Sequence, residues 1–353
     1  MTNAISNTNY IEFLKSKIVL AQSKTVNFEN IELHPSLFGH QGEMVHWALK
    51  NGRGLIAASF GLGKSRVQCE IARQLVMHYS QPFLLVCPLG VKHQFVDEDG
   101  PQMGIEWQYV RTDEEIRNAT TPYLVTNYER VRDGAIDPRK HEFCGVSLDE
   151  GSVLRSFASK TYQTFQDVFV GVQHRFVCTA TPSPNKTREL IYYAQWLGIM
   201  DTGQALTRFF QRNPDKAGDL QLHPQHAEAF WMWVASWALF LYTPSDIGHS
   251  DEGYVLPELR VHWHCVGVDQ TRAFKTTDNR GQNKLILDVA SNDIRNDARE
   301  RRETLDARLA KMQEILEAEP DRHCLLWHHL EDERRAIEKA VPDATAVYGS
   351  QER

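Results

Sequence analysis

Short apolar runs alternate with amphipathic stretches of helical period between residues 35 and about 200. A doubly wound parallel sheet requires this alternation of strands and helices, because helices cover both of its faces. The expected strands cover residues 54–58, 83–87, 122–126, 145–149 and 174–178. The pattern therefore predicts an α/β fold.

The pattern changes on both sides of this stretch. Residues 1–34 are expected to form an N-terminal extension with one helix around Tyr10–Ala21. Residues 201–260 read as mostly helical. We expect them to complete a first globular unit that covers residues 35–260.

One segment of this helical region, Ala229–Leu241, is apolar almost throughout. It is too short to cross a bilayer, because a spanning helix needs about 20 apolar residues. A buried helix with Trp233 and Trp237 on one face is the favoured interpretation. A platform that stacks the bases of a single strand is the alternative.

The C-terminal part begins with a different pattern and then returns to the first one. Residues 261–320 look like a connector, with a strand pattern at Val261–Val266 and a charged amphipathic helix at Asn292–Glu319. Residues 321–353 again alternate between strand and helix patterns. The expected elements there are a strand at 323–327, a helix at 331–340 and a strand at 344–348.

Composition narrows the class of protein. The 353 residues are too many for one hydrophobic core, so we expect roughly two or three units. The formal net charge of −7 argues against a surface that is basic throughout, so nucleic acid would have to bind in a local basic groove. The six cysteines include no C-x-x-C pair, which leaves a zinc site unsupported.

Cysteine usage and the first residues also bear on location. Most of the cysteines lie in apolar segments, where a buried free thiol is the usual state, and this favours a reducing compartment. Residues Met1–Ser6 do not read as the start of a signal peptide. We therefore expect a cytoplasmic protein with no membrane partner.

Residues 55–65 read as an apolar strand, a glycine-rich turn and the start of a helix. Backbone N–H groups of such a turn point at an anion, and the helix adds the positive end of its dipole. Lys64 would then reach the β- and γ-phosphates of ATP, and the Ser65 hydroxyl would bind Mg²⁺. The residues expected to hold the nucleotide here are Gly61, Leu62, Gly63, Lys64 and Ser65.

A second part of the expected site is the acidic pair Asp149 and Glu150, which ends the apolar run at 145–149. A carboxylate at the C-terminal end of a parallel strand faces the place where ligands bind in open α/β sheets. Asp149 would hold Mg²⁺ through water, and Glu150 would polarise the attacking water as a general base. An acidic pair of no special function at a strand end is the common alternative.

Taken in order, these motifs resemble those of superfamily 2 helicases and translocases. The motifs are Gln41, the loop at 58–65 with Ala58 in place of the first glycine, Asp149–Ser152 and Thr179–Pro182. Three further segments are similar to the Swi/Snf-like branch, and especially to its phage or prophage members. They are residues 86–95, 124–129 and 243–257, and the whole resemblance covers residues 35–353.

The resemblance implies a P-loop NTPase, with a RecA-like doubly wound parallel sheet and helical additions. Residues 35–260 would be the first RecA-like, ATP-binding lobe, and residues 321–353 the incomplete beginning of a second RecA-like lobe. If the protein is of the phage type, we expect it to be located in the cytoplasm of a bacterial or phage-infected host cell.

The resemblance also assigns roles to side chains outside the phosphate loop. Gln41 would recognise the adenine edge, since an amide can both donate to it and accept from it. Thr179 and Thr181 would couple the state of the phosphates to contacts with DNA. Lys92 and Asn127 lie in segments that touch a nucleic-acid backbone, although loop capping explains these two residues equally well.

Two functions from different classes follow. The first is a DNA-dependent ATPase that translocates on, or remodels, double-stranded DNA. The second is an ATP-binding or interaction module without hydrolysis, which needs a partner subunit for its second lobe. Intact Lys64, Asp149 and Glu150 favour the first, whereas an end at Arg353, before any arginine finger, leads us to expect weak or absent turnover in this polypeptide.

Overall fold

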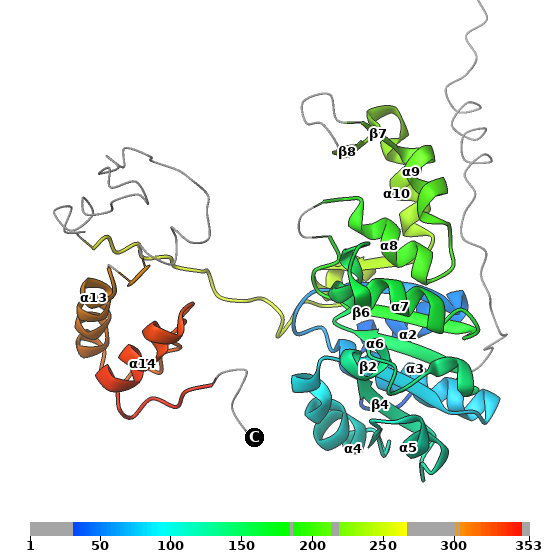
Figure 1. The fold of residues 1–353 in the computed structure, drawn as a ribbon, viewed down its shortest axis with the longest axis horizontal. Helices are drawn as coiled ribbons and strands as arrows, with labels where there is room; N and C mark the ends of the chain where they lie inside the picture. The colour runs from blue at the N-terminus through cyan, green and yellow to red at the C-terminus, as the bar shows by residue number, and fades with distance from the viewer. Residues whose placement is uncertain (1–30, 184–185, 213–218, 267–300, 303, 348–353) are drawn as a thin grey trace, which may run out of the picture. The chain divides into compact units, whose positions relative to one another are not determined.

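The computed structural model describes residues 31–183, 186–212, 219–266, 301–302 and 304–347 (Figure 1). The chain divides into two compact units, with the boundary after Leu256. The helix expected around Tyr10–Ala21 lies outside the described residues.

The first unit is built on a parallel sheet that has seven strands in the described part of the chain, in the order β3-β4-β2-β5-β6-β1-β9. The predicted α/β, RecA-like doubly wound fold is confirmed, as are the five strands expected from the pattern. β3 and β9, at the two edges, were not predicted. The bounds are β1 Arg53–Ala58, β2 Phe83–Cys87, β3 Gln108–Tyr109, β4 Tyr123–Asn127, β5 Gly145–Asp149, β6 His174–Thr179 and β9 Ala238–Leu241.

Helices cover both faces of this sheet. Side chains alternate between the faces along each strand, so that Leu55 and Ala57 of β1 join one core while Ile56 and Ala58 join the other. Helices α2 and α3 pack on the second core, and α6, α7 and α8 pack on the first. The bounds are α2 Gly39–Asn51, α3 Lys64–Tyr79, α4 Gly100–Gln102, α5 Asp113–Arg117, α6 Tyr128–Arg132, α7 Lys160–Val168, α8 Glu189–Trp196, α9 Thr202–Phe209 and α10 Ala227–Ala235.

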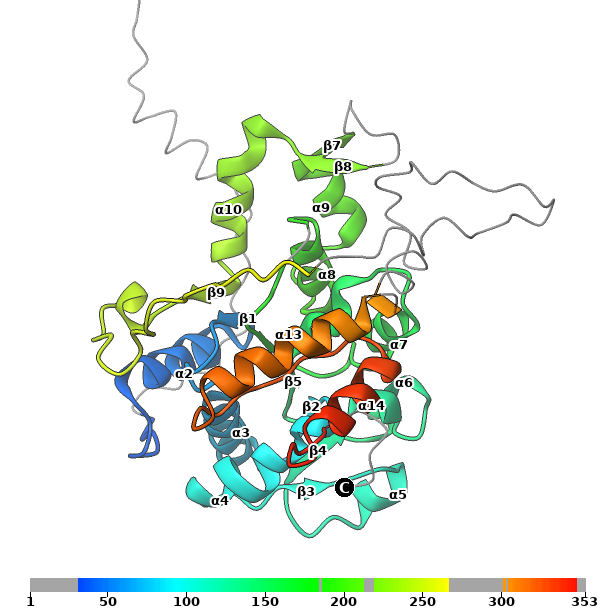
Figure 2. The ribbon, with the colours of Figure 1, turned by 90° about the vertical axis from the view of Figure 1, so that its left-hand side faces the viewer.

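The end of the first unit differs from the mostly helical prediction. Two short strands, β7 at Phe210–Arg212 and β8 at Leu220–Leu222, form an antiparallel pair. Together with α9 and α10 they lie beyond the β1–β9 end of the sheet, away from β3 (Figures 1 and 2).

The apolar run at 229–241 is not one buried helix. Helix α10 ends at Ala235, and β9 then pairs in parallel with β1. Periodicity cannot separate a buried helix from a buried strand in so short an apolar run. Trp233 and Trp237 are both buried and their ring centroids lie 5.3 Å apart, although only Trp233 belongs to the helix.

The second unit contains α13 at Leu305–Ala318 and α14 at Glu331–Ala340. The helix predicted at 331–340 is confirmed. The helix predicted at 292–319 is confirmed for its described C-terminal part, whereas residues 292–300 lie outside the described chain. An ion pair of 2.6 Å between Arg308 and Glu333 joins the two helices.

The strands predicted in this unit are wrong for the residues that the structure describes, which are 261–266, 323–327 and 344–347. Their apolar side chains are largely exposed, with Trp263 at 88% and Leu325 at 76%. Alternation predicts a strand only where neighbouring strands accept its hydrogen bonds, and the described part of this unit supplies none. The assignment of residues 321–353 to a second RecA-like lobe stays a prediction.

Candidate nucleotide-binding site

The glycine-rich loop leads from the end of β1 at Ala58 to the start of α3 at Lys64. Gly61 and Gly63 adopt φ values of 81° and 76°, in the left-handed region that favours glycine. The sequence therefore turns sharply at the end of a buried strand and presents the N-terminus of a helix of 16 residues. This is the geometry of an anion-binding loop.

Lys64 lies across this loop. Its Nζ donates hydrogen bonds to the carbonyl oxygens of Ala58 at 2.9 Å and Ser59 at 3.0 Å. Burial lowers the pKa of Lys64, and the nearby carboxylates of Asp149 and Glu150 oppose this shift. The ammonium group is thus fixed within the loop, where an anion could take the place of the two carbonyl contacts.

Asp149 ends β5, which lies next to β6 and two strands from β1 in the sheet. Its Oδ1 accepts a hydrogen bond of 2.8 Å from Nε2 of Gln68 on α3. The Oε1 of Gln68 in turn accepts a bond of 2.6 Å from the hydroxyl of Ser147. The pKa of Asp149 is raised to about 6, mainly by burial; the charge of Glu150 also raises it, whereas the hydrogen bond from Gln68 lowers it.

Glu150 and Thr179 meet at the ends of β5 and β6. The Thr179 hydroxyl donates to Oε1 of Glu150 at 3.1 Å, and its oxygen accepts from the backbone N–H of Thr181 at 3.1 Å. Glu150 itself has a φ of 48°, a left-handed conformation that is uncommon outside glycine and that often occurs at functional sites. The structure thus brings together the expected base and the two expected coupling threonines.

Gln41 is buried on α2 and faces the loop. Its Nε2 donates to the Leu62 carbonyl at 3.4 Å, and its Oε1 accepts from the Phe38 N–H at 3.1 Å. A Cβ atom at Gly63 would lie only 2.1 Å from the Gln41 Nε2. The amide therefore holds the loop directly, and recognition of adenine by Gln41 stays a prediction that would require these bonds to be exchanged.

A cavity of about 560 Å³ opens beside the start of α2. The Phe38 ring is 58% exposed and stacks on His40, and Tyr254 packs edge-on against His40 at 5.1 Å. Sequence reasoning assigned no role to these aromatic groups, because residues 249–254 approach α2 only through the fold. The cavity is lined by Phe38, Gly39, His40, His249, Ser250, Glu252, Gly253 and Tyr254.

The expected DNA-facing residues Lys92 and Asn127 lie close to each other. Both contact Tyr109 of β3: the Lys92 Nζ is 4.7 Å from the ring centroid, and the tyrosine hydroxyl donates to Oδ1 of Asn127 at 2.8 Å. The Asn127 amide also donates to Glu129 at 2.5 Å. Tyr109 was missed by the sequence analysis, since a strand of two residues leaves no pattern.

Ser65, the other expected Mg²⁺ ligand, is bonded to the same segment that carries Lys92. The Gln94 amide donates to the Ser65 hydroxyl oxygen at 2.9 Å and to Asp99 at 3.2 Å. Gln94 begins a short π-helix that runs to Asp99, a feature that is frequent at functional sites.

A hydroxyl and a carboxylate fit Mg²⁺ well. This ion prefers oxygen ligands and keeps several waters, so it needs only one or two protein ligands beside the phosphates of a nucleotide. Ser65 and Asp149 supply such oxygens. Among the described residues, no group of three or more His, Cys, Asp or Glu side chains could hold a metal ion by itself.

The described cysteines include no disulfide. Cys69, Cys87, Cys144 and Cys178 are buried, and Cys265 and Cys324 are exposed. Within the part of the chain that the structure describes, every helix is too short or too polar to span a bilayer.

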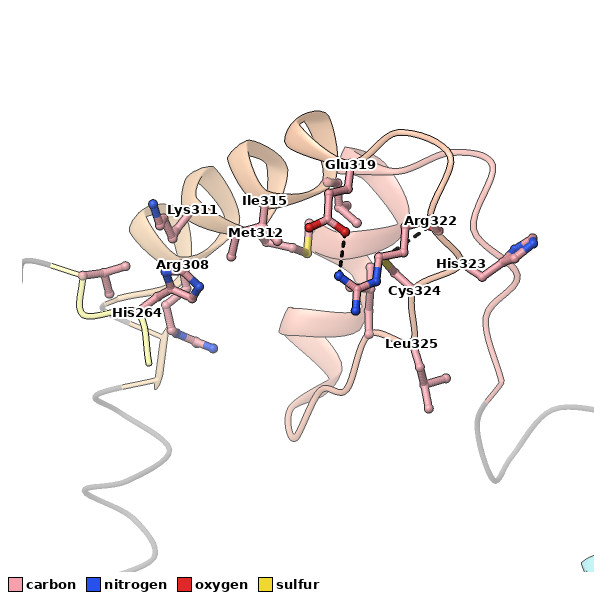
Figure 3. Close-up of a pocket in the computed structure, with 13 residues that line it drawn as sticks. His264, Arg308, Lys311, Met312, Ile315, Glu319, Arg322, His323, Cys324 and Leu325 are labelled. Carbon is pink, nitrogen blue, oxygen red and sulfur yellow. Dashed lines mark hydrogen bonds and ion pairs between the residues drawn. The ribbon is translucent and has the colours of Figure 1, made fainter. Parts of the chain in front are cut away.

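A further cavity, of about 530 Å³, lies in the second unit and has none of the expected site residues in its walls (Figure 3). Met312 and Ile315 of α13 form part of its apolar lining. Arg322 pairs with Glu319 at 2.6 Å, so these two charges satisfy each other.

Comparison with protein families bears on the first unit. The model of the SNF2-related domain matches residues 40–213, which include the glycine-rich loop, the acidic pair and both threonines. This chain contains an SNF2-related domain. The resemblance to Swi/Snf-like members of superfamily 2 is thereby confirmed, whereas the phage type stays a prediction.

One solved structure supports the fold of the SNF2-related domain, and two others are reported beside it. The SWI2/SNF2 ATPase core of Sulfolobus solfataricus in complex with dsDNA is similar, with 18% identity and a TM-score of 0.51 over 62% of this chain and 48% of that one. The SWI2/SNF2 ATPase core domain of the same organism has 17% identity and a TM-score of 0.49 over 65% of this chain and 49% of that one.

The UvsW helicase from bacteriophage T4 has 16% identity and a TM-score of 0.37, over 56% of this chain and 67% of that one. This chain spans about half the length of the two Sulfolobus structures. No curated protein matches it.

Proposed function

We propose that the first unit binds Mg²⁺·ATP and is the motor lobe of a DNA-dependent ATPase that translocates on, or remodels, double-stranded DNA. The main support for this proposal is that the expected site residues lie together at the ends of β1, β5 and β6. There the glycine-rich loop, Asp149 and Glu150 meet, and Gln68 and Thr179 join them through hydrogen bonds. A site that only bound nucleotide would have no need for a base such as Glu150.

Different residues of the site would bind the phosphates, bind Mg²⁺ and accept the proton of the attacking water. The loop amides and Lys64 would hold the phosphates, and Ser65 and Asp149 would hold Mg²⁺, which when bound neutralises the charge of the phosphates. Glu150 would accept the proton of the attacking water. The ring of Phe38, exposed beside the cavity at the start of α2, offers a surface for the adenine.

Binding tests the nucleotide part of the proposal. We expect calorimetry to show Mg²⁺-dependent binding of ATP and ADP, and Lys64→Ala to weaken it strongly because the only charged group of the loop is lost. Glu150→Gln should keep the binding and abolish whatever phosphate release the protein shows, since an amide accepts no proton. Folded protein that binds neither nucleotide would refute the proposal.

DNA contact is proposed for the cluster of Lys92, Tyr109 and Asn127. The Sulfolobus structure with the same fold was solved in complex with dsDNA, which supports a duplex as the substrate. We expect a labelled duplex to bind, and Lys92→Ala to weaken binding and lower the salt slope by about one. Lys160→Ala, which removes an exposed lysine on α7, is the control and should change neither. Equal effects of the two substitutions would contradict this assignment.

A further inference from the structure

Gln68 is a polar side chain that the SNF2-related domain buries completely. It lies on α3, next to apolar residues such as Val67 and Cys69, and has an exposed fraction of 0%. A buried amide costs free energy unless its donor and acceptor groups are both bonded. Here both are: the amide nitrogen contacts Asp149 and the amide oxygen contacts Ser147.

The chemistry of the partners fixes the direction of this chain of bonds. An ionised carboxylate only accepts hydrogen bonds, so the Gln68 side chain must turn its NH₂ group toward Asp149. Its oxygen then faces Ser147, whose hydroxyl is 0% exposed and donates to it at 2.6 Å. Ser147 and Asp149 are two residues apart on β5 and so share one face of the strand.

We infer that Gln68 is a positioning residue for the Mg²⁺ site, with Ser147 holding Gln68 in place. The inference rests on the proposed function. The Gln68 bond fixes the rotation of the Asp149 carboxylate, and a carboxylate that accepts one such bond still has lone pairs for the water molecules of a hydrated Mg²⁺. Groups that orient metal ligands in this way influence metal affinity, and their loss typically costs about 10- to 100-fold.

The same helix offers a matched control. Gln74 is 6% exposed and also uses its amide inside the protein, since its Nε2 donates to Glu70 at 2.7 Å and to the Glu32 carbonyl at 2.9 Å. Replacing Gln74 by Met therefore removes a buried amide from α3 without touching Asp149.

The experiment compares the affinity for ADP with excess Mg²⁺ and with EDTA, by calorimetry on the full chain. Gln68→Met keeps the volume of the side chain and removes both bonds. We expect it to reduce the Mg²⁺-dependent gain in ADP affinity by about tenfold or more, while affinity in EDTA stays within about twofold. Gln74→Met should leave the gain unchanged, and Ser147→Ala should reduce it by a smaller factor than Gln68→Met.

The outcomes separate this inference from the proposed function. Wild-type protein that binds ADP, with the same Mg²⁺-dependent gain in Gln68→Met, would overturn the positioning role alone. Wild-type protein that binds no nucleotide would overturn both. If Gln68→Met does not fold, Gln68→Asn replaces it, because its amide is one carbon too short to reach Asp149. An unchanged gain in that variant would equally contradict the inference.

Discussion

At the scale of one residue, the buried carboxylate of Asp149 lowers the free energy of unfolding when it is ionised. Burial raises its pKa from 3.8 to about 6 in the folded chain. The unfolded chain therefore releases this proton at a lower pH, so the folded state loses stability as the pH rises from about 4 to about 6. At neutral pH, where Asp149 is ionised, the free energy of unfolding is therefore lower than it would be with an uncharged side chain at this position.

Asp149→Asn should remove this cost. We expect the variant to be more stable than wild type above pH 6, by about 1 to 3 kcal/mol, and the difference to vanish as the pH falls toward 4. Urea unfolding at several pH values, without Mg²⁺, measures it. A difference that is constant across this range would show that the carboxylate is not the group responsible.

At the scale of the elements, two buried arginines hold the N-terminal end of the sheet to the end of α8. Arg53 of β1 and Arg175 of β6 are register partners. Arg53 donates to the carbonyls of Gln173, Val172 and Leu197 at 2.8 to 3.2 Å, whereas Arg175 donates to the Trp196 carbonyl. Burial, together with the charge of Arg53, lowers the pKa of Arg175 to about 9.

Replacing each of the two arginines by Met should lower the free energy of unfolding by different amounts. Arg53→Met leaves three carbonyls without their donor, and we expect a loss of about 2 to 4 kcal/mol. Both substitutions relieve the repulsion between the two buried charges, but Arg175→Met leaves only the Trp196 carbonyl without its donor, so its cost should stay below about 1 kcal/mol. The free energy of unfolding of both variants checks this, and a greater loss for Arg175→Met would contradict it.

The elements also show what sequence patterns could and could not predict. Five central strands, the glycine-rich loop and the acidic pair follow from local sequence, because each is a buried run that ends in a turn or a charge. The edge strand β9 does not, because it continues the apolar run of α10 and periodicity cannot separate the two. The strands β7 and β8 do not either, because three residues are too few to leave a pattern.

The same distinction separates the residues of the site. Lys64 and Glu150 stand in motifs, whereas the contacts of Gln68 and Tyr109 arise only in the fold. One signal for Gln68 was present: an uncharged polar residue within the apolar part of a helix that follows a phosphate loop.

At the scale of the whole molecule, the first unit should work alone. The expected site residues lie between Gln41 and Thr181, and the last strand of the sheet ends at Leu241. We expect a chain stopped after Leu256 to fold and to bind Mg²⁺·ADP within about twofold of the full chain, because the boundary between the units falls there. Loss of cooperative unfolding in this fragment would show that residues after 256 are part of its core.

The position of β1 in the sheet also sets an order of events during synthesis. Among the described residues it is the first of the seven strands along the chain, yet its two neighbours are β6 and β9, the last two strands of the sheet to be made. At about 5 to 20 residues per second, a ribosome needs several seconds or more to reach β6. Until then the apolar strand β1, which leads into the glycine-rich loop, lacks both of its partner strands. During this time it is exposed to pairing with other chains, and the proposed nucleotide site is still incomplete.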